Sequence, residues 1–102
     1  MNFAAIKKLQ KLQKEMEQTQ EEIANTIISE TSNGLVTVDV KGTKEICGIK
    51  INPDFEIESS DDYELLSDLI VAACNVCYNK IDKLTEEKMK KYQALLGPMG
   101  GF

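Results

Sequence analysis

Residues 33–53 read NGLVTVDVKGTKEICGIKINP, and this stretch decides the fold of the chain. Gly34 and Gly42 mark two tight turns, and the residues between them alternate between apolar and polar side chains, which indicates a strand. The apolar positions of this strand share one face: Val36, Val38 and Val40. A second run follows at 45–51 and β-branched residues at 27–32 precede the first turn, so the simplest interpretation is a three-stranded antiparallel meander over 27–52.

The run at 45–51 carries an irregularity. Cys47, Ile49 and Ile51 are in phase with one another, whereas Ile46 is out of that phase. Gly48 sits where a β-bulge would be tolerated, because a glycine accepts the distorted backbone of a bulge.

Long helices are predicted on both sides of this sheet. Residues 1–26 contain no Gly or Pro and place apolar side chains at alternating spacings of four and three, with Phe3 and Ile6 widening the stripe near the start. An acidic loop at 53–61 leads to a second helix at 62–95, whose first half is apolar nearly all round. Residues 96–102 are rich in glycine and are expected to form a flexible tail. The stripe of the first helix consists of Ala5, Leu9, Leu12, Met16, Thr19 and Ile23.

The predicted fold is a single α+β domain over 1–102 in which both helices outreach the sheet. Helices of roughly 40–50 Å do not fit inside a globule of this length, whose radius of gyration would be about 13 Å. Their apolar stripes need a partner, so we expect a two-fold symmetric, tweezer-like homodimer. The residues expected to pack in its core or dimer interface are Leu9, Leu12, Met16, Val36, Val38, Ile49, Leu66, Leu69, Ile70 and Ala73.

Composition argues against catalysis. The 102 residues include no His, and all 12 basic residues are Lys, so the commonest general base and metal ligand and the bidentate phosphate clamp are missing. Cys74 and Cys77 form a CxxC motif, but inside a helix among apolar residues they are best read as small packing side chains. A zinc site would need two further ligands, and only Cys47 remains. We therefore expect no enzyme activity, metal, cofactor or small-molecule substrate.

The cellular setting follows from the same composition. No apolar run is long enough to span a bilayer, the first residues do not resemble a signal peptide, and an odd number of cysteines fits reduced thiols. We expect a cytoplasmic protein without a membrane partner.

Charge is segregated along the chain, although the net charge is -5. Residues 1–14 hold four lysines and no acid, and 80–95 hold five lysines against three acids. Residues 15–33 and 53–68 contain acids and no base. These lysines are either ordinary solvated helix faces or two basic prongs that contact an anionic polymer through its phosphates. The candidate DNA-binding residues are Lys7, Lys8, Lys11, Lys14, Lys88, Lys90 and Lys91.

The whole chain resembles the YbaB/EbfC family of small bacterial nucleoid-associated proteins. The similarity lies in the order of four blocks: Leu9-Gln10-Lys11-Leu12-Gln13-Lys14-Glu15-Met16; Asn33-Gly34-Leu35-Val36 with Val38 and Gly42; Ile49-Lys50-Ile51-Asn52-Pro53; and Leu66-Ser67-Asp68-Leu69-Ile70-Val71-Ala72-Ala73-Cys74-Asn75. Lys80, Glu87-Lys88-Met89 and a Gly/Pro/Met tail follow in the same order. Val76 and Cys77 depart from the pattern, which typically has a small acidic residue and Ala there.

The resemblance implies a homodimer with central β-structure and protruding helices. It also implies binding of double-stranded DNA with limited sequence preference, location on the nucleoid, and a role in nucleoid organisation or gene regulation. The alternative is a prefoldin-like protein-binding scaffold or chaperone subunit, which has the same order of helix, strands and helix. Prefoldin-like subunits use longer heptad seams with apolar tips, whereas the prongs here are basic, which favours DNA.

Overall fold

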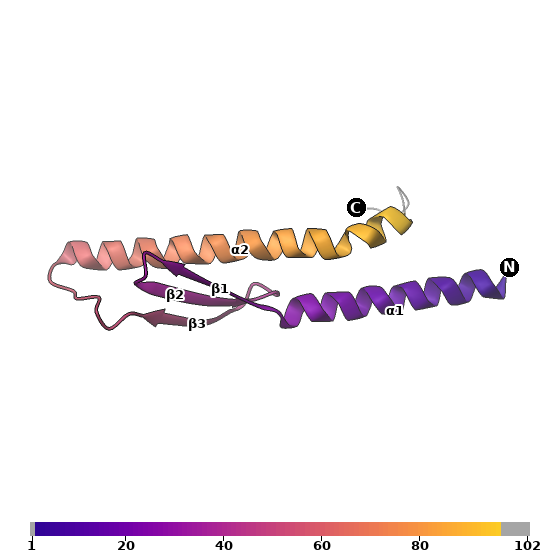
Figure 1. The fold of residues 1–102 in the computed structure, drawn as a ribbon, viewed down its shortest axis with the longest axis horizontal. Coiled ribbons are helices and arrows are strands. Elements are labelled where there is room, and N and C mark those ends of the chain that lie inside the picture. Colours follow the sequence, from indigo (N-terminus) through magenta and orange to yellow (C-terminus); the bar gives the residue numbers. More distant parts are fainter. Residues whose placement is uncertain (1, 97–102) are drawn as a thin grey trace.

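The computed structural model describes residues 2–96 and confirms an α+β fold (Figure 1). Helix α1 spans Phe3–Asn25, strands β1, β2 and β3 span Ile27–Ser32, Val36–Lys41 and Ile46–Ile51, and helix α2 spans Ser60–Leu96. The strands form one antiparallel sheet in the order β1-β2-β3, which is the predicted meander. Residues 97–102, most of the predicted flexible tail, lie outside the described residues.

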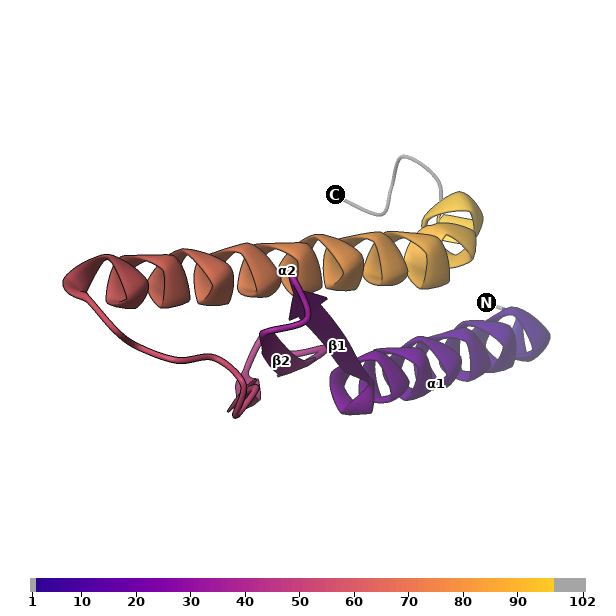
Figure 2. The same ribbon diagram turned by 60° about the vertical axis from the view of Figure 1, so that its left-hand side comes forward.

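The molecule is elongated because only one of its two helices, α2, packs along the sheet. Helix α2 lies along one side of the sheet, and α1 leads away from the sheet and then runs beside the last turns of α2 (Figure 1, Figure 2). The extents are 72 × 22 × 15 Å and the radius of gyration is 19.9 Å. This exceeds the value of about 13 Å for a compact chain of the same length.

The core lies between β2 and α2. Val36, Val38 and Val40 are completely buried, as the alternation of β2 predicts. They face a stripe of α2 residues spaced four apart, namely Leu69, Ala73, Cys77 and Ile81. Because α2 packs on β1 and β2, this stripe covers one edge and the centre of the sheet.

A bulge in β3 changes which of its residues share the apolar face. Ile49 and Ile51 lie opposite Val38 and Val36, but a register shift places Ile46, not Cys47, opposite Val40. The extra residue is accommodated by a bulge next to Gly48. The expectation that Cys47, and not Ile46, is in phase with Ile49 and Ile51 is therefore wrong, because the bulge puts Ile46 on the apolar face in place of Cys47.

The turn between β2 and β3 fixes the end of α1. The backbone N–H of Gly42 donates to the carbonyl of Thr26 at 2.9 Å. A Cβ at Gly42 would come within 1.7 Å of the Ile23 carbonyl oxygen, so only glycine lets the turn approach the helix this closely. The Thr26 hydroxyl donates to the Glu22 carbonyl at 2.7 Å and caps the last turn.

Helix α2 begins two residues before the predicted start. Its N-terminus is held by Asp62, whose carboxylate accepts the backbone N–H groups of Glu58 and Ser59 at 2.7 and 3.0 Å. Asp61 and Asp62 also place negative charge in the first turn, where the helix dipole favours it. An acid of the first turn of α2 thus fixes the end of the loop that leads into the helix.

The residues predicted to pack fall into three groups. Val36, Val38, Leu69 and Ala73 are buried, and Leu12, Met16, Leu66 and Ile70 are half-buried. Leu9 and Ile49 are 55% and 44% exposed, so neither belongs to the core of a single chain. Leu9 lies in the N-terminal half of α1, which contains no buried residue, and Ile49 lies on β3, whereas α2 packs on β1 and β2.

Candidate nucleic-acid interface

The N-terminal half of α1 projects from the molecule. Its C-terminal half lies beside α2, whereas its first turns extend beyond the end of α2 (Figure 1). The N-terminal half of α1 carries Lys7, Lys8, Lys11 and Lys14, and all four side chains are exposed. Within residues 2–96 none of them forms an ion pair.

These four lysines do not form a single row. At about 100° per residue, Lys7, Lys11 and Lys14 fall within roughly 60° of one another around α1. Lys8 lies about 100° from Lys7, on the flank nearer the apolar stripe. A straight row of three cations therefore runs along one face of the projecting helix.

Phe3 lies on the same face as the lysine row. It is within about 80° of Lys7, Lys11 and Lys14 and about 160° from the centre of the apolar stripe. The expectation that Phe3 widens that stripe is wrong, because the first turn of α1 carries this side chain to the opposite side. Its side chain is 80% exposed.

The lysines near the end of α2 have closer neighbours. Lys88 pairs with Glu22 of α1 at 3.8 Å, and the Lys91 ammonium lies 4.9 Å from the centroid of the Tyr92 ring. Both line a polar hollow of about 310 Å³ between the helices, together with Thr19, Glu22 and Glu87. Lys90 is exposed on the far side of the helix from Lys88. The structure does not bring the three into one row.

The two helices meet at Tyr92. This side chain is 2% exposed, and its hydroxyl forms a 2.9 Å hydrogen bond with that of Thr19. Beside it, Met16 and Met89 contribute to a mostly apolar pocket of about 240 Å³. Tyr92 was not among the residues predicted to pack, although it is one of the few apolar residues in the mostly charged second half of α2, with Ile81, Leu84 and Met89.

Two lysines near the sheet are paired with acids. Lys80 lies 2.7 Å from Glu30 on β1, and this hydrogen bond and charge raise the pKa of the Lys80 ammonium. Lys44 lies 2.8 Å from Asp82 of α2. Lys41 and Lys50 in the strands form no ion pair within residues 2–96 either, so the N-terminal half of α1 is distinguished by its four closely spaced lysines.

The cysteines lie in positions that suit packing. Cys77 is completely buried, and its Sγ lies 3.7 Å from the carbonyl oxygens of Ile28 and Val38. Burial, followed by the negative charge of Glu30, raises the pKa of the Cys77 thiol, so it stays protonated. Cys74 is half-buried and Cys47 is exposed on β3. Among residues 2–96, no three Cys, Asp or Glu side chains are grouped closely enough to hold a metal ion.

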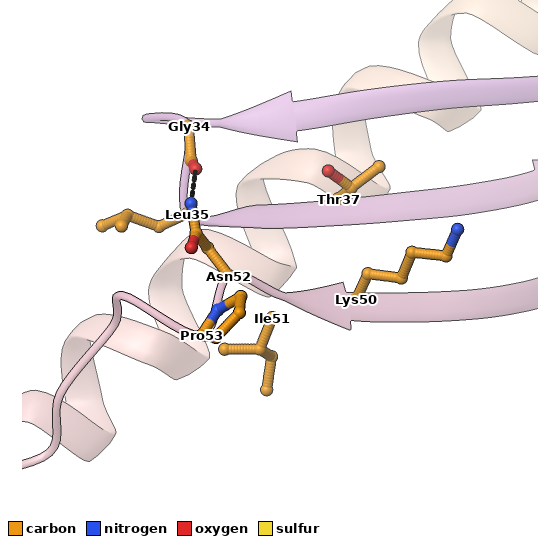
Figure 3. Close-up of a pocket in the computed structure, with 7 residues that line it drawn as sticks. All are labelled: Gly34, Leu35, Thr37, Lys50, Ile51, Asn52 and Pro53. Carbon is orange, nitrogen blue, oxygen red and sulfur yellow. Dashed lines mark hydrogen bonds between the residues drawn. The ribbon is translucent and has the colours of Figure 1, made fainter.

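A further hollow lies at the end of the sheet where the chain leaves β3 (Figure 3). Asn52 closes it by donating from its side-chain amide to the Gly34 carbonyl at 3.1 Å. Its backbone N–H donates to the Leu35 carbonyl at 2.7 Å, and its side-chain oxygen accepts from the backbone of Asp54 at 2.9 Å. Lys50 is the one charged residue in the lining, so the hollow reflects turn structure and offers no catalytic group.

The described helices include none that is long and apolar enough to cross a membrane. Comparison with solved structures shows the same fold in an uncharacterized protein from Helicobacter pylori, with a TM-score of 0.65 and 24% sequence identity. That comparison covers 95% of this chain and 99% of the other.

Curated relatives are more similar in sequence. A nucleoid-associated protein of Clostridium acetobutylicum is 46% identical over 87 residues, which cover 84% of this chain and 76% of the relative. A nucleoid-associated protein of Lactococcus lactis subsp. cremoris is 40% identical over 94 residues, which cover 90% of this chain and 93% of the relative. The sequence profile of the YbaB/EbfC DNA-binding family matches residues 1–96. The chain therefore belongs to the YbaB/EbfC DNA-binding family.

Proposed function

We propose that this protein is a non-enzymatic, nucleoid-associated protein that binds double-stranded DNA as a homodimer. The observation that carries the proposal is the row of exposed lysines without acidic partners on the projecting half of α1, in a chain that belongs to a DNA-binding family. An acidic protein can bind DNA only where its cations are separated from its carboxylates, and α1 provides such a place.

The chemistry of lysine sets the mode of binding. An ammonium group contacts a phosphate as a point charge and lacks the planar fork with which arginine reads guanine. Contacts to phosphates fix a protein on the duplex without reading its sequence. Binding by Lys7, Lys11 and Lys14 would therefore show limited sequence preference and a steep dependence on salt, which suits a role in nucleoid organisation or gene regulation.

The acidic part of the molecule favours an approach by way of α1. The acids of 53–68 lie in the loop after β3 and the first turns of α2, at the end of the molecule away from the N-terminus (Figure 1). Phosphates are repelled by that end and attracted by the lysine row. We propose Lys88, Lys90 and Lys91 as secondary contacts. Lys88 would have to break its ion pair with Glu22 before it could contact a phosphate.

The uncovered face of β3 supports the homodimer. Ile46, Ile49 and Ile51 share the apolar face of the sheet, yet each is 44–47% exposed because α2 packs on β1 and β2. The partly buried residues beside the α2 core stripe, namely Leu66, Ile70, Cys74 and Tyr78, extend the same apolar region. An exposed apolar surface of this kind marks an interface, and we assign it to a second copy of the chain.

The test is a titration of duplex DNA at several salt concentrations with two charge-matched variants. Lys7→Glu/Lys11→Glu changes the lysine row, and Lys41→Glu/Lys83→Glu makes the same change in net charge elsewhere. We expect the first variant to lose roughly tenfold or more in affinity and to flatten the salt dependence by about 0.9 per lost phosphate contact. Equal losses in both variants would show that net charge alone acts, and unchanged binding in the first would exclude α1.

The same preparations address the prefoldin-like alternative. The family match favours DNA over an unfolded client protein. A protein that suppresses aggregation of an unfolded client, and that fails to retard DNA at physiological salt, would reverse this preference.

A further inference from the structure

Phe3 is a large apolar side chain in an unexpected place. It stands four residues before Lys7 and so heads the lysine row, on the face of α1 opposite the apolar stripe. At 80% exposure it is more exposed than Leu9, whereas Leu12 and Met16 of the stripe are half-buried. Folding of the chain therefore gives this phenyl ring no packing role, although exposing it to water is unfavourable.

The position of the ring suits a contact with DNA. Phe3 and Lys7 are one helical turn apart, about 6 Å along the axis, and point in similar directions. A helix face that brings Lys7, Lys11 and Lys14 to phosphates also brings Phe3 to the duplex. Proteins that bind the minor groove of DNA frequently insert an apolar side chain such as phenylalanine between base pairs, and this wedge bends the duplex.

We propose that Phe3 inserts between two base pairs of the bound duplex and bends it, while the lysine row holds the flanking phosphates. This inference rests on the proposed DNA binding and adds a contact that involves no charge. The contact gains affinity by removing the ring from water and loses part of that gain in unstacking the bases. Sites with easily unstacked pyrimidine–purine steps should therefore bind best.

The test uses the full chain and a duplex of about 30 base pairs labelled at both ends for energy transfer. We expect the wild type to shorten the end-to-end distance. Phe3→Ala should abolish the bend and weaken binding by roughly five- to twentyfold, the size expected when a buried aromatic contact is removed. The salt dependence should stay the same, because no cation is lost.

Two further variants provide controls. Phe3→Leu keeps an apolar wedge and should retain most of the bend. Tyr63→Ala removes an exposed aromatic side chain from the first turn of α2, at the other end of the molecule, and should leave bending and affinity unchanged. Helix content by circular dichroism checks the fold, and little change is expected because Phe3 is exposed.

The outcomes separate this inference from the proposed function. If the wild type binds duplex DNA but Phe3→Ala bends it equally well, the wedge is excluded while the DNA-binding function stands. The wedge is also excluded if Phe3→Ala loses affinity for single-stranded DNA while the wild type does not bend the duplex. The ring would then stack on unpaired bases. If the wild type binds no DNA at any salt concentration, the proposed function fails and the wedge fails with it.

Discussion

Neighbouring acidic residues determine which lysine side chains of this protein are available to bind an anion. Lys7, Lys11 and Lys14 have no acidic partner within residues 2–96, whereas Lys44, Lys80 and Lys88 each lie within 4 Å of a carboxylate. A lysine that must first leave a carboxylate gains less on meeting a phosphate. Equal numbers of lysines in two segments therefore do not imply equal contributions to binding.

Gly42 is the residue most sensitive to enlargement. Gly42→Ala should lower the free energy of unfolding by about 2 kcal/mol or more, because the new methyl group would collide with the backbone of Ile23 and the turn would have to move. Urea denaturation measures the effect. Gly48→Ala is the matched control, since the nearest atom to its Cβ would be Asp39 Oδ2 at 3.7 Å, an ordinary contact. Equal losses in the two variants would contradict the steric explanation.

At the scale of elements, the junction of α1 and α2 holds the projecting helix. The second half of α1 is attached by the buried side chain of Ile23, by the Thr19–Tyr92 hydrogen bond and by the contact of Gly42. The apolar pocket beside Tyr92 shows that the helices are not tightly packed there. The direction of the lysine row therefore depends on few contacts, and the hydroxyl pair is the most specific of them.

The hydroxyl pair can be tested with a double-mutant cycle. Tyr92→Phe and Thr19→Val each remove one partner, and each should cost about 1 kcal/mol in stability, because a hydrogen bond is lost and its other group is left in a partly buried place. The double variant should cost less than the sum, which reveals the coupling. Additive costs would mean that the 2.9 Å contact contributes nothing.

At the scale of the whole molecule, the proposed dimer interface is the uncovered face of β3. Ile49→Lys places a charge in the centre of the proposed interface and should convert the dimer to a monomer, as measured by sedimentation at micromolar concentration. Ile27→Lys is the control. Ile27 is 56% exposed and pairs with Lys41, next to the pair formed by Ile28 and Val40. Because successive residues of a strand point to opposite faces, Ile27 lies on the face of the sheet opposite to Val40. A wild type that sediments as a monomer would exclude the proposed homodimer.

Local patterns in the sequence determined the elements of this protein. Alternation in 35–40 predicted β2 and its buried valines, spacings of three and four predicted the helices, and the distribution of lysines predicted a basic segment, since each of these depends on neighbours close in the chain. The order of motifs also indicated the family, which the comparisons show. The assignment of particular lysines to DNA remains a prediction.

Only the tertiary structure decided which surfaces are covered. It moved Ile46 onto the apolar face through a bulge, left Ile49, Leu9 and Phe3 exposed, and paired Lys88 with Glu22. The physical reason is that burial and charge pairing depend on residues distant in the chain. Glu22 and Lys88, or Thr19 and Tyr92, become neighbours only after the strands have reversed the direction of the chain and brought α2 back beside α1.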